Sequence, residues 1–384
     1  MSDPRFIELL EEQVGRDAAS RVLQALEQEA SVSVRLNPAK MDSCPFPDAT
    51  PVEWSPYGYL LGGRPQFTMD PLFHAGCYYV QDSSAMFVGE VFRRVLDGFG
   101  AGVSVLDLCA APGGKTTDLS ASLRLRFGDG GFRLLANEVV PKRCAVLRSN
   151  IGTWGDPGTA VVSRDPSAFG VSPLFDIIVA DVPCSGEGMF RKDATARAQW
   201  SEENVDFCVA RQRKIIADIW PALRPGGILI YSTCTFNRRE NDGNAQWIAS
   251  ELGASFVDIG PVPNCIFRTA CGYAMLPGFV PGEGQWVTAL RKDGELSGVP
   301  APDAARLLRA WYPPEILTAA YPLVDVPLET ALAYLHGDAV RLGPEAPLGF
   351  VSISYKGHPL GPGKNIGTRC NNLYPKEKRI RKDV

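Results

Sequence analysis

The sequence lacks the features that mark secreted, membrane-spanning and zinc-binding proteins. No stretch approaches the roughly 18 apolar residues of a membrane helix. The acidic start, MSDPRFIELLEEQ, has no basic region followed by an apolar run, as a signal peptide would. Among the ten cysteines no two are spaced C-x-x-C, which disfavours a zinc site. We therefore expect a cytoplasmic protein with free thiols, no metal and no membrane contact.

Internal repeats, low-complexity tracts and an excess of positive charge are also absent. The formal net charge of −4 argues against a chain that binds nucleic acid over its whole surface. The last 21 residues differ, because seven Lys or Arg against two acids leave them at +5. This basic end comprises Lys364, Arg369, Lys376, Lys378, Arg379, Arg381 and Lys382, with Glu377 and Asp383. It predicts either an RNA-binding surface or simply a solvated tail.

The length of 384 residues predicts two or three domains, and 45% hydrophobic with 21% charged residues is typical of a folded protein. Apolar residues at helical spacing over 5–28 predict one or two helices, and 31–37 alternates like a strand. A proline-rich stretch follows over 41–75, and a helix is expected near 83–95. We assign residues 1–95 to a small α+β region.

The segment 96–292 is predicted to form an α/β domain with a doubly wound, Rossmann-like sheet. Its buried apolar runs begin near 103, 133, 160, 175 and 227 and alternate with helical stretches, a pattern typical of parallel strands. A last run, 285–292, is expected as an antiparallel edge strand. Residues 293–384 read as a linker, a helix over 304–313 and a small β-rich domain.

The turn VLDLCAAPGGKTTDLS follows the first of these strands and leads into a helix, where such folds bind nucleotide-like ligands. A phosphate loop would need glycine where Cys109 stands, and a dinucleotide fingerprint would need a third glycine. A tight turn without a ligand and a loop for S-adenosylmethionine (SAM) both remain. For SAM, Glu138 at the end of the second strand would bind the ribose hydroxyls, and Asp165 would reach the adenine.

Two cysteines stand where neighbouring strands end, Cys184 in DVPC and Cys234 in YSTCT. Because adjacent strand ends meet at one edge of a sheet, we expect both thiols in one cleft beside the turn. A single buried cysteine is usually inert packing, but two in polar exit loops favour a chemical role. A thiolate that adds to carbon 6 of cytosine makes carbon 5 nucleophilic, and a second thiol or a carboxylate can assist the later steps.

The segments LCAAPGGKTT, ADVPCSGEGMFRK and YSTCTFNRREN together resemble the Nol/Nop/Sun family of RNA 5-methylcytosine methyltransferases, which use SAM. SVRLNP at 33–38 and AGCYYVQDSSAMF at 75–87 are similar to the segments that precede the cofactor loop in that family. The C-terminal LGPGKNIGTRCNNLYPK resembles the signature of the bacterial F-type branch, which acts on small-subunit ribosomal RNA.

The resemblance implies a role for each matching residue. Cys234 would be the nucleophile, Cys184 would assist release of the product, and Asp181 would contact both the cofactor and the cytosine. The cofactor would be held by Cys109, Ala110, Ala111, Pro112, Gly113, Gly114, Lys115, Glu138, Asp165 and Asp181. The RNA would be bound by the N-terminal region 1–95, by Lys192 and Arg143 near the site, and by Lys364, Arg369 and Lys376 in a C-terminal domain of the PUA type.

The sequence departs from the family pattern where Pro277 is followed by Gly278 instead of histidine, and its C-terminal region is short. Three alternatives stay open: a methyltransferase acting on transfer RNA, an RNA-binding ribosome-assembly factor without activity, and a nucleotide hydrolase. The expected partner is 16S ribosomal RNA or the small ribosomal subunit, and the expected oligomeric state is a monomer.

Overall fold

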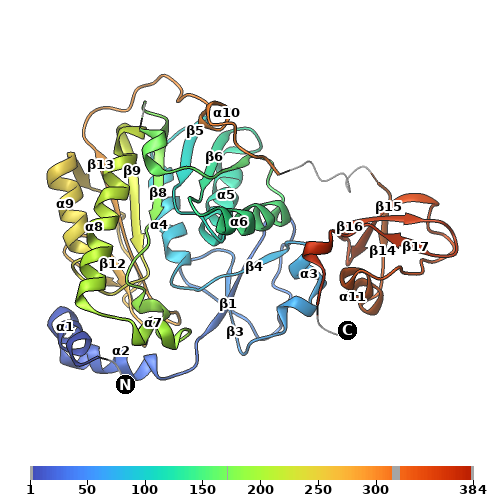
Figure 1. The fold of residues 1–384 in the computed structure, drawn as a ribbon, viewed down its shortest axis with the longest axis horizontal. Helices are drawn as coiled ribbons and strands as arrows, with labels where there is room; N and C mark the ends of the chain where they lie inside the picture. Colours follow the sequence, from blue (N-terminus) through green and yellow to red (C-terminus); the bar gives the residue numbers. More distant parts are fainter. Residues whose placement is uncertain (1–2, 171, 314–320, 382–384) are drawn as a thin grey trace.

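A computed structural model describes residues 3–170, 172–313 and 321–381, and the chain forms three sheets (Figure 1). The first sheet, in the order β2-β3-β1-β4, is antiparallel in every pairing and lies in the N-terminal region. Its elements and neighbours are α1 (Pro4–Val14), α2 (Arg16–Leu26), β1 (Val32–Leu36), β2 (Thr50–Pro51), β3 (Gly58–Leu61), the 3-10 turn η1 (Phe67–Met69), α3 (Pro71–His74), β4 (Tyr78–Val80) and α4 (Met86–Leu96).

The central sheet has the order β11-β12-β13-β9-β8-β5-β6-β7, with β10 also paired to β13. The strands β5 to β9 pair in parallel, as their buried apolar runs predict, whereas β13 is antiparallel to β9. The strands are β5 (Val103–Asp107), β6 (Phe132–Asn137), β7 (Thr159–Val162), β8 (Phe175–Asp181), β9 (Leu223–Thr233), β10 (Ala254–Phe256), β11 (Phe267–Arg268), β12 (Tyr273–Met275) and β13 (Gln285–Lys292).

Helices cover both faces of this sheet because successive strand residues point to opposite sides. In β8, Ile177 and Val179 pack with α4 on one face, and Ile178 and Ala180 pack with α8 and α9 on the other. The connecting helices and 3-10 turns are α5 (Gly114–Phe127), α6 (Pro141–Trp154), η2 (Pro166–Phe169), η3 (Glu187–Met189), α7 (Ala194–Ala198), α8 (Glu202–Ile219), η4 (Trp220–Ala222) and α9 (Asp242–Leu252). The predicted doubly wound α/β sheet is thereby confirmed.

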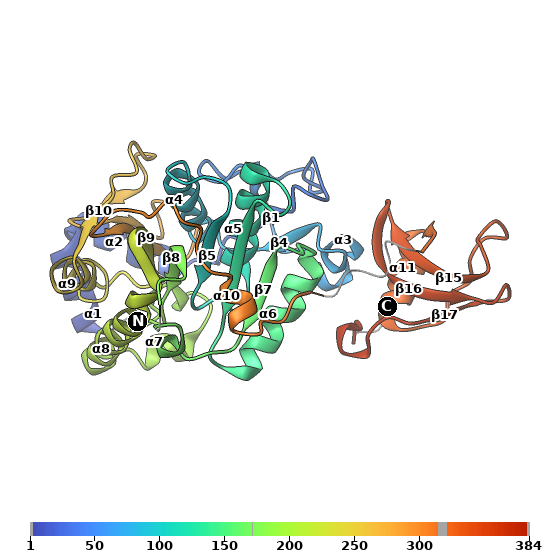
Figure 2. The same ribbon diagram turned by 90° about the horizontal axis from the view of Figure 1, so that it is seen from above.

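The third sheet, β14-β15-β16-β17, forms a small domain at one end of the molecule (Figures 1 and 2). Its elements and those of the preceding segment are α10 (Ala304–Leu307), β14 (Leu323–Asp325), α11 (Leu328–His336), β15 (Gly349–Tyr355), β16 (His358–Asn365), β17 (Cys370–Asn372) and η6 (Lys376–Lys378). Its core is continuous with that of the N-terminal sheet, since Val34 and Leu72 belong to the same buried cluster as Leu335 and Tyr374.

Two details differ from the sequence prediction. The strand β13 is not at the edge, because β12 and β10 pair with it on the side away from β9. The helix predicted over 304–313 ends at Leu307. Arg309 adopts a left-handed φ of 52°, and the backbone of Trp311 then pairs with Val161 of β7 through two hydrogen bonds of 2.7 and 2.8 Å. A strand-like bridge thus replaces the last turns of that helix.

Candidate active site

The loop between β5 and α5 lies where the chain leaves β5 with β6 on one side and β8 on the other. Open α/β sheets bind ligands at such a switch point. Gly113 has a φ of +114°, which residues with a side chain rarely adopt, and a Cβ atom there would lie 3.2 Å from Leu147. The turn therefore requires glycine at this position.

Three side chains, two from α6 and one from β1, bind the carbonyl groups of this loop and fix its backbone. The contacts are Arg143 to Ala111 O (2.9 Å), Asn150 Nδ2 to Pro112 O (2.8 Å) and Arg35 to Gly114 O (3.1 Å). A loop held in this way loses little conformational freedom when a ligand binds, which favours affinity.

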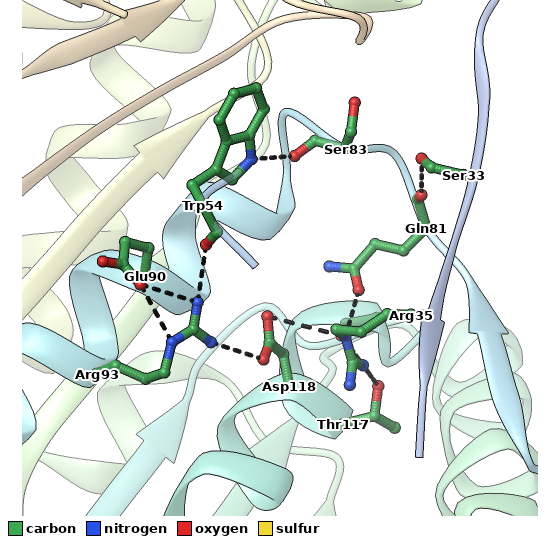
Figure 3. Close-up of polar contacts among 10 residues, drawn as sticks. Ser33, Arg35, Trp54, Gln81, Ser83, Glu90, Arg93, Thr117 and Asp118 are labelled. Atoms are coloured by element: carbon green, nitrogen blue, oxygen red, sulfur yellow. Dashed lines mark hydrogen bonds and ion pairs between the residues drawn. The ribbon is translucent and has the colours of Figure 1, made fainter. Parts of the chain in front are cut away.

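Arg35 of β1 belongs to a buried polar network that joins the N-terminal region to α5 (Figure 3). Its side chain is completely buried, donates to Gln81 Oε1 at 2.9 Å and to Thr117 Oγ1 at 2.5 Å, and faces Asp118 at 3.8 Å. Arg93 of α4 approaches the same Asp118 carboxylate at 3.2 Å. The network therefore ties the start of α5, directly after the cofactor loop, to β1 and α4.

A cavity of about 410 Å³ opens beside the loop. Its volume falls in the range of about 300 to 1,000 Å³ that is usual for small-molecule sites. Of the predicted site residues, those lining it are Cys109, Ala110, Ala111, Pro112, Gly114, Lys115, Asp181, Lys192 and Cys234. The structure thus brings most of the predicted cofactor loop, the predicted nucleophile and the predicted base-binding carboxylate together in one cavity.

Asp181, the last residue of β8, is oriented by three donors. Its Oδ2 accepts from Lys115 Nζ at 2.8 Å, and its Oδ1 accepts from Ser232 Oγ at 2.8 Å and from Gln285 Nε2 at 3.0 Å. Burial opposes the charge on Lys115, but the Asp181 carboxylate outweighs it, so the pKa of the ammonium is raised. Lys115 is therefore a fixed cation between the cofactor loop and Asp181.

The two predicted cysteines meet at the ends of adjacent strands. Cys184 Sγ lies 3.3 Å from Cys234 Sγ, and both side chains are free thiols of intermediate exposure. The hydrogen bond with Cys234, followed by burial, raises the pKa of Cys184 well above its ordinary value. The structure therefore places one protonated thiol against the other, with only Cys234 lining the cavity.

Polar side chains hold the two cysteine loops in this arrangement. Ser185 Oγ and Thr235 Oγ1 lie 2.8 Å apart, and Glu240 accepts from the Ser185 backbone N–H at 3.1 Å. The backbone N–H of Gly188 donates to the Cys234 carbonyl at 2.7 Å, and a Cβ atom on that glycine would approach the same oxygen to 2.5 Å. This close approach explains the second glycine of CSGEGMF, Gly188.

Sequence reasoning missed three polar residues of the cavity, Asp82, Glu283 and Gln285. Glu283 is 4% exposed, pairs with Arg191 at 2.9 Å and lies 3.8 Å from Lys192, and its backbone N–H donates to Asp82 at 3.1 Å. Burial raises the pKa values of both Asp82 and Glu283. Asp82 stands in the QDSS segment, whereas nothing local in GEGQW marks the other two.

The remaining predicted cofactor residues lie outside the lining of this cavity. Glu138, at the end of β6, is 2% exposed, and its Oε2 accepts no hydrogen bond from the described residues although an Arg143 nitrogen lies 3.3 Å away. Such a buried acceptor suits the hydroxyl of a ligand. Asp165 is exposed after β7 and accepts from the Ser167 backbone N–H at 3.1 Å, so its adenine contact stays a prediction.

The predicted RNA contacts are spread over two regions. Arg143 faces the cofactor loop and Glu138, and Lys192 is at the rim of the cavity. Lys364, Arg369 and Lys376 are exposed in the C-terminal domain. Lys382 lies outside the described residues. Tyr374, which the sequence left open as a stacking residue, is instead a core residue, 5% exposed and packed on Tyr334.

Gly278, which stands where many relatives have histidine, has a left-handed φ of +84°, and a Cβ atom there would lie 2.9 Å from the Arg21 carbonyl of α2. Packing of α2 therefore leaves no room for a side chain at this place. Across the described parts of the chain, no helix is long and apolar enough to cross a membrane, and no group of three His, Cys, Asp or Glu could hold a metal ion.

Family models match three consecutive segments of the chain. Residues 100–253 match the model described as 16S rRNA methyltransferase RsmB/F. Residues 3–83 match the N-terminal domain of 16S rRNA methyltransferase RsmF, and residues 321–380 match the methyltransferase RsmF PUA domain. The models thus cover the N-terminal and C-terminal sheets and the parallel strands β5 to β9 of the central sheet.

Curated relatives named ribosomal RNA small subunit methyltransferase F support this match. The protein of Pectobacterium atrosepticum is 35% identical over 66% of this chain, and that of Escherichia coli K12 is 34% identical over 73%. The chain spans only 53% and 61% of the length of these two relatives, but 91% of the Klebsiella pneumoniae protein, at 29% identity.

Solved structures share the fold. A methyltransferase homologue from Pyrococcus horikoshii matches 76% of this chain with a TM-score of 0.63 and 23% identity, covering 95% of its own length. NSun6 from the same organism, solved with SFG, matches 76% with a TM-score of 0.61 and 17% identity, covering 99% of its length. These findings confirm SAM as the predicted cofactor and the C-terminal domain as PUA-like. The chain belongs to the RsmB/F methyltransferase family.

Proposed function

We propose that this protein methylates carbon 5 of a cytosine in small-subunit ribosomal RNA. The observation that carries the proposal is the pair of thiols, Cys184 and Cys234. Their sulfur atoms lie 3.3 Å apart, and Cys234 lines the same cavity as the predicted cofactor loop. The names of the relatives, all small-subunit ribosomal RNA methyltransferases, support the choice of substrate.

Cys234 would act as the nucleophile. Its thiolate forms a bond to carbon 6 of the cytosine, and the electrons of the 5,6 double bond move so that carbon 5 becomes nucleophilic. SAM supplies the electrophilic methyl group that carbon 5 attacks. Cys109 to Lys115, with Glu138, would hold the cofactor, because these residues form the fixed turn and carry the buried acceptor next to it.

Asp181 would hold the base during this addition. Its carboxylate is tied to Lys115, Ser232 and Gln285, so its position is set before the RNA arrives. A cytosine presents an amino group and a ring nitrogen on one edge. A carboxylate accepts from the amino group, and from the ring nitrogen once that nitrogen is protonated. Asp181 would thereby orient the ring over Cys234 and support protonation of the ring nitrogen as the sulfur adds.

Cys184 would assist product release. The proton on carbon 5 must leave, the double bond must form again and the sulfur–carbon bond to Cys234 must break. While Cys234 is free, its hydrogen bond and charge keep the pKa of Cys184 high. Once Cys234 is bonded to the base as an uncharged thioether, its contribution disappears while that of burial remains, so the pKa of Cys184 falls and the thiolate forms more readily. The second thiol would thus become a base only after the adduct has formed.

The test is methyl transfer from labelled SAM to assembled small ribosomal subunits, naked small-subunit RNA and bulk transfer RNA, followed by nucleoside analysis. We expect 5-methylcytidine on ribosomal material. Cys234→Ala should abolish it, and Cys184→Ala should accumulate a covalent protein–RNA complex that survives denaturing electrophoresis. Cys265→Ala, at a half-buried thiol away from the cavity lining, is the matched control and should behave as the parent protein.

Label on transfer RNA alone would leave the chemistry standing and overturn the choice of substrate. Activity in Cys234→Ala together with normal turnover in Cys184→Ala would overturn the two-thiol mechanism. Binding of SAM without transfer to any of the three RNAs would instead favour an RNA-binding assembly factor.

A further inference from the structure

A second cavity, of about 740 Å³, lies next to the one that contains Cys234 and is larger than it. Its walls come from three parts of the chain: the N-terminal segment 64–80, helix α6 and the C-terminal segment 374–378. The two cavities share Tyr79 and Val80 in their linings, so one opens beside the other. No predicted catalytic or cofactor residue lines this second cavity.

The walls of the second cavity combine aromatic, polar and cationic groups. Phe67 and Phe73 are neighbouring rings with centroids 6.4 Å apart, and the guanidinium of Arg64 lies over Phe67 at 5.9 Å. Lys378 enters from the C-terminal domain and donates to Thr153 Oγ1 of α6 at 3.1 Å. Aromatic rings with cations beside them are typical of sites for unpaired nucleotides, because the base stacks on the rings and the cations neutralise the phosphate.

The wall between the cavities is in direct contact with the cofactor loop. Tyr79 packs so closely that a Cβ atom on Gly114 would lie 3.3 Å from its ring. Asn150 Nδ2 donates both to Tyr79 Oη at 3.4 Å and to Pro112 O at 2.8 Å. A ligand in the second cavity would therefore press on the residues that hold this loop.

We propose that the second cavity binds the nucleotide next to the target cytosine, as an unpaired base of the substrate RNA strand. The proposal rests on the proposed function, because a cytosine can reach Cys234 only after it has left its stack, and its neighbour then loses a stacking partner. Phe67, Phe73 and Tyr79 replace that partner, and Arg64 and Lys378 face the phosphate. Glu377 also lines the cavity and is exposed, so its carboxylate remains in solvent at the rim.

The first variant fills the cavity. Ser149 lies on α6, is half-buried and lines the second cavity, so Ser149→Trp would occupy the space of a base. Ala145 lies on the same helix, is exposed and lines neither cavity, which makes Ala145→Trp the matched control. We expect Ser149→Trp to raise the KM for small-subunit RNA by roughly 5- to 100-fold, as loss of one stacked base would, while the KM for SAM changes less than about twofold.

A second experiment does not depend on how that variant folds. It uses the unchanged protein and substrate RNA that carries 4-thiouridine at the nucleotide on either side of the methylated cytosine. Light cross-links this RNA to the protein, and the linked peptides are mapped. Cross-links within residues 64–78, 149–154 or 374–378 support the proposal, and cross-links from both positions only to other segments overturn it. A folded Ser149→Trp variant with the RNA KM of Ala145→Trp would overturn it as well.

These outcomes are separable from failure of the proposed function. If the unchanged protein forms no 5-methylcytidine on ribosomal or transfer RNA, the proposed function fails and this proposal falls with it. If it forms the product and only the Ser149 and cross-linking results are negative, the proposed function stands and the second cavity is not an RNA site.

Discussion

Replacing Arg35 with methionine tests whether the network of Figure 3 fixes the cofactor loop. Methionine keeps most of the side-chain volume but removes the charge and the hydrogen bonds to Gln81, Gly114 and Thr117. Breaking a buried ion pair by removing one partner costs about 3 to 5 kcal/mol. Because Arg93 still faces Asp118 at 3.2 Å, the remaining charge stays compensated. We therefore expect a loss of about 3 kcal/mol in the free energy of unfolding, at the lower end of that range.

The assay is urea unfolding followed by tryptophan fluorescence, with the loss calculated from the shift in midpoint at constant slope. Arg126→Met is the matched control, since the side chain of Arg126 is 49% exposed, pairs with Asp97 at 3.3 Å and lies outside the network. That variant should lose about 1 kcal/mol or less, as exposed pairs do. In the folded state, Arg35→Met should also weaken SAM binding, measured by titration calorimetry, because the Gly114 carbonyl is released.

Two results would refute this reasoning. Equal losses in Arg35→Met and Arg126→Met would mean that burial of the network contributes nothing beyond an exposed pair. Unchanged SAM affinity in a destabilised Arg35→Met would mean that the network supports the fold but not the loop.

Two further predictions concern the same loop. Burial raises the pKa of Asp107 to about 7 in the folded protein, above its unfolded value, so stability is fully present below about pH 4 and is lost as pH rises to about 7. In Asp107→Asn the free energy of unfolding should fall less steeply with pH, by up to about 1.4 kcal/mol for each pH unit in that window. The measurement is urea unfolding at several pH values, and a pH dependence equal to that of the parent would contradict the prediction. Gly113→Ala should lower the unfolding free energy by about 1 to 3 kcal/mol and weaken SAM binding, because alanine is strained at a φ of +114°; Gly100→Ala, where a Cβ atom meets no neighbour, is the control.

The sequence was sufficient to predict the central sheet and the meeting of the two thiols. The runs that became β5 to β9 are buried on both faces. The expectation that Cys184 and Cys234 share one cleft holds because β8 and β9 pair side by side in the sheet. The helix over 304–313 was predicted too long because its apolar spacing says nothing of Val161, the distant strand residue that pairs with Trp311. Glu283 and Gln285 were missed for a similar reason, since only the pairing of β13 with β9 brings them to Asp181 and Lys192. The second cavity depends on contacts among three distant segments, which no local pattern contains.

The shared core of the N-terminal sheet and the C-terminal domain has a consequence for synthesis on the ribosome. Val34 and Leu72 leave the ribosome early, whereas Leu335 and Tyr374, which belong to the same buried cluster, leave near the end of translation. Domains generally fold as units from the N-terminus during synthesis. The N-terminal sheet, however, cannot bury its apolar face until the C-terminal domain has emerged. The nascent chain therefore carries an exposed hydrophobic surface through most of translation, and a chain truncated before residue 335 would keep it, as a substrate for chaperones and proteases.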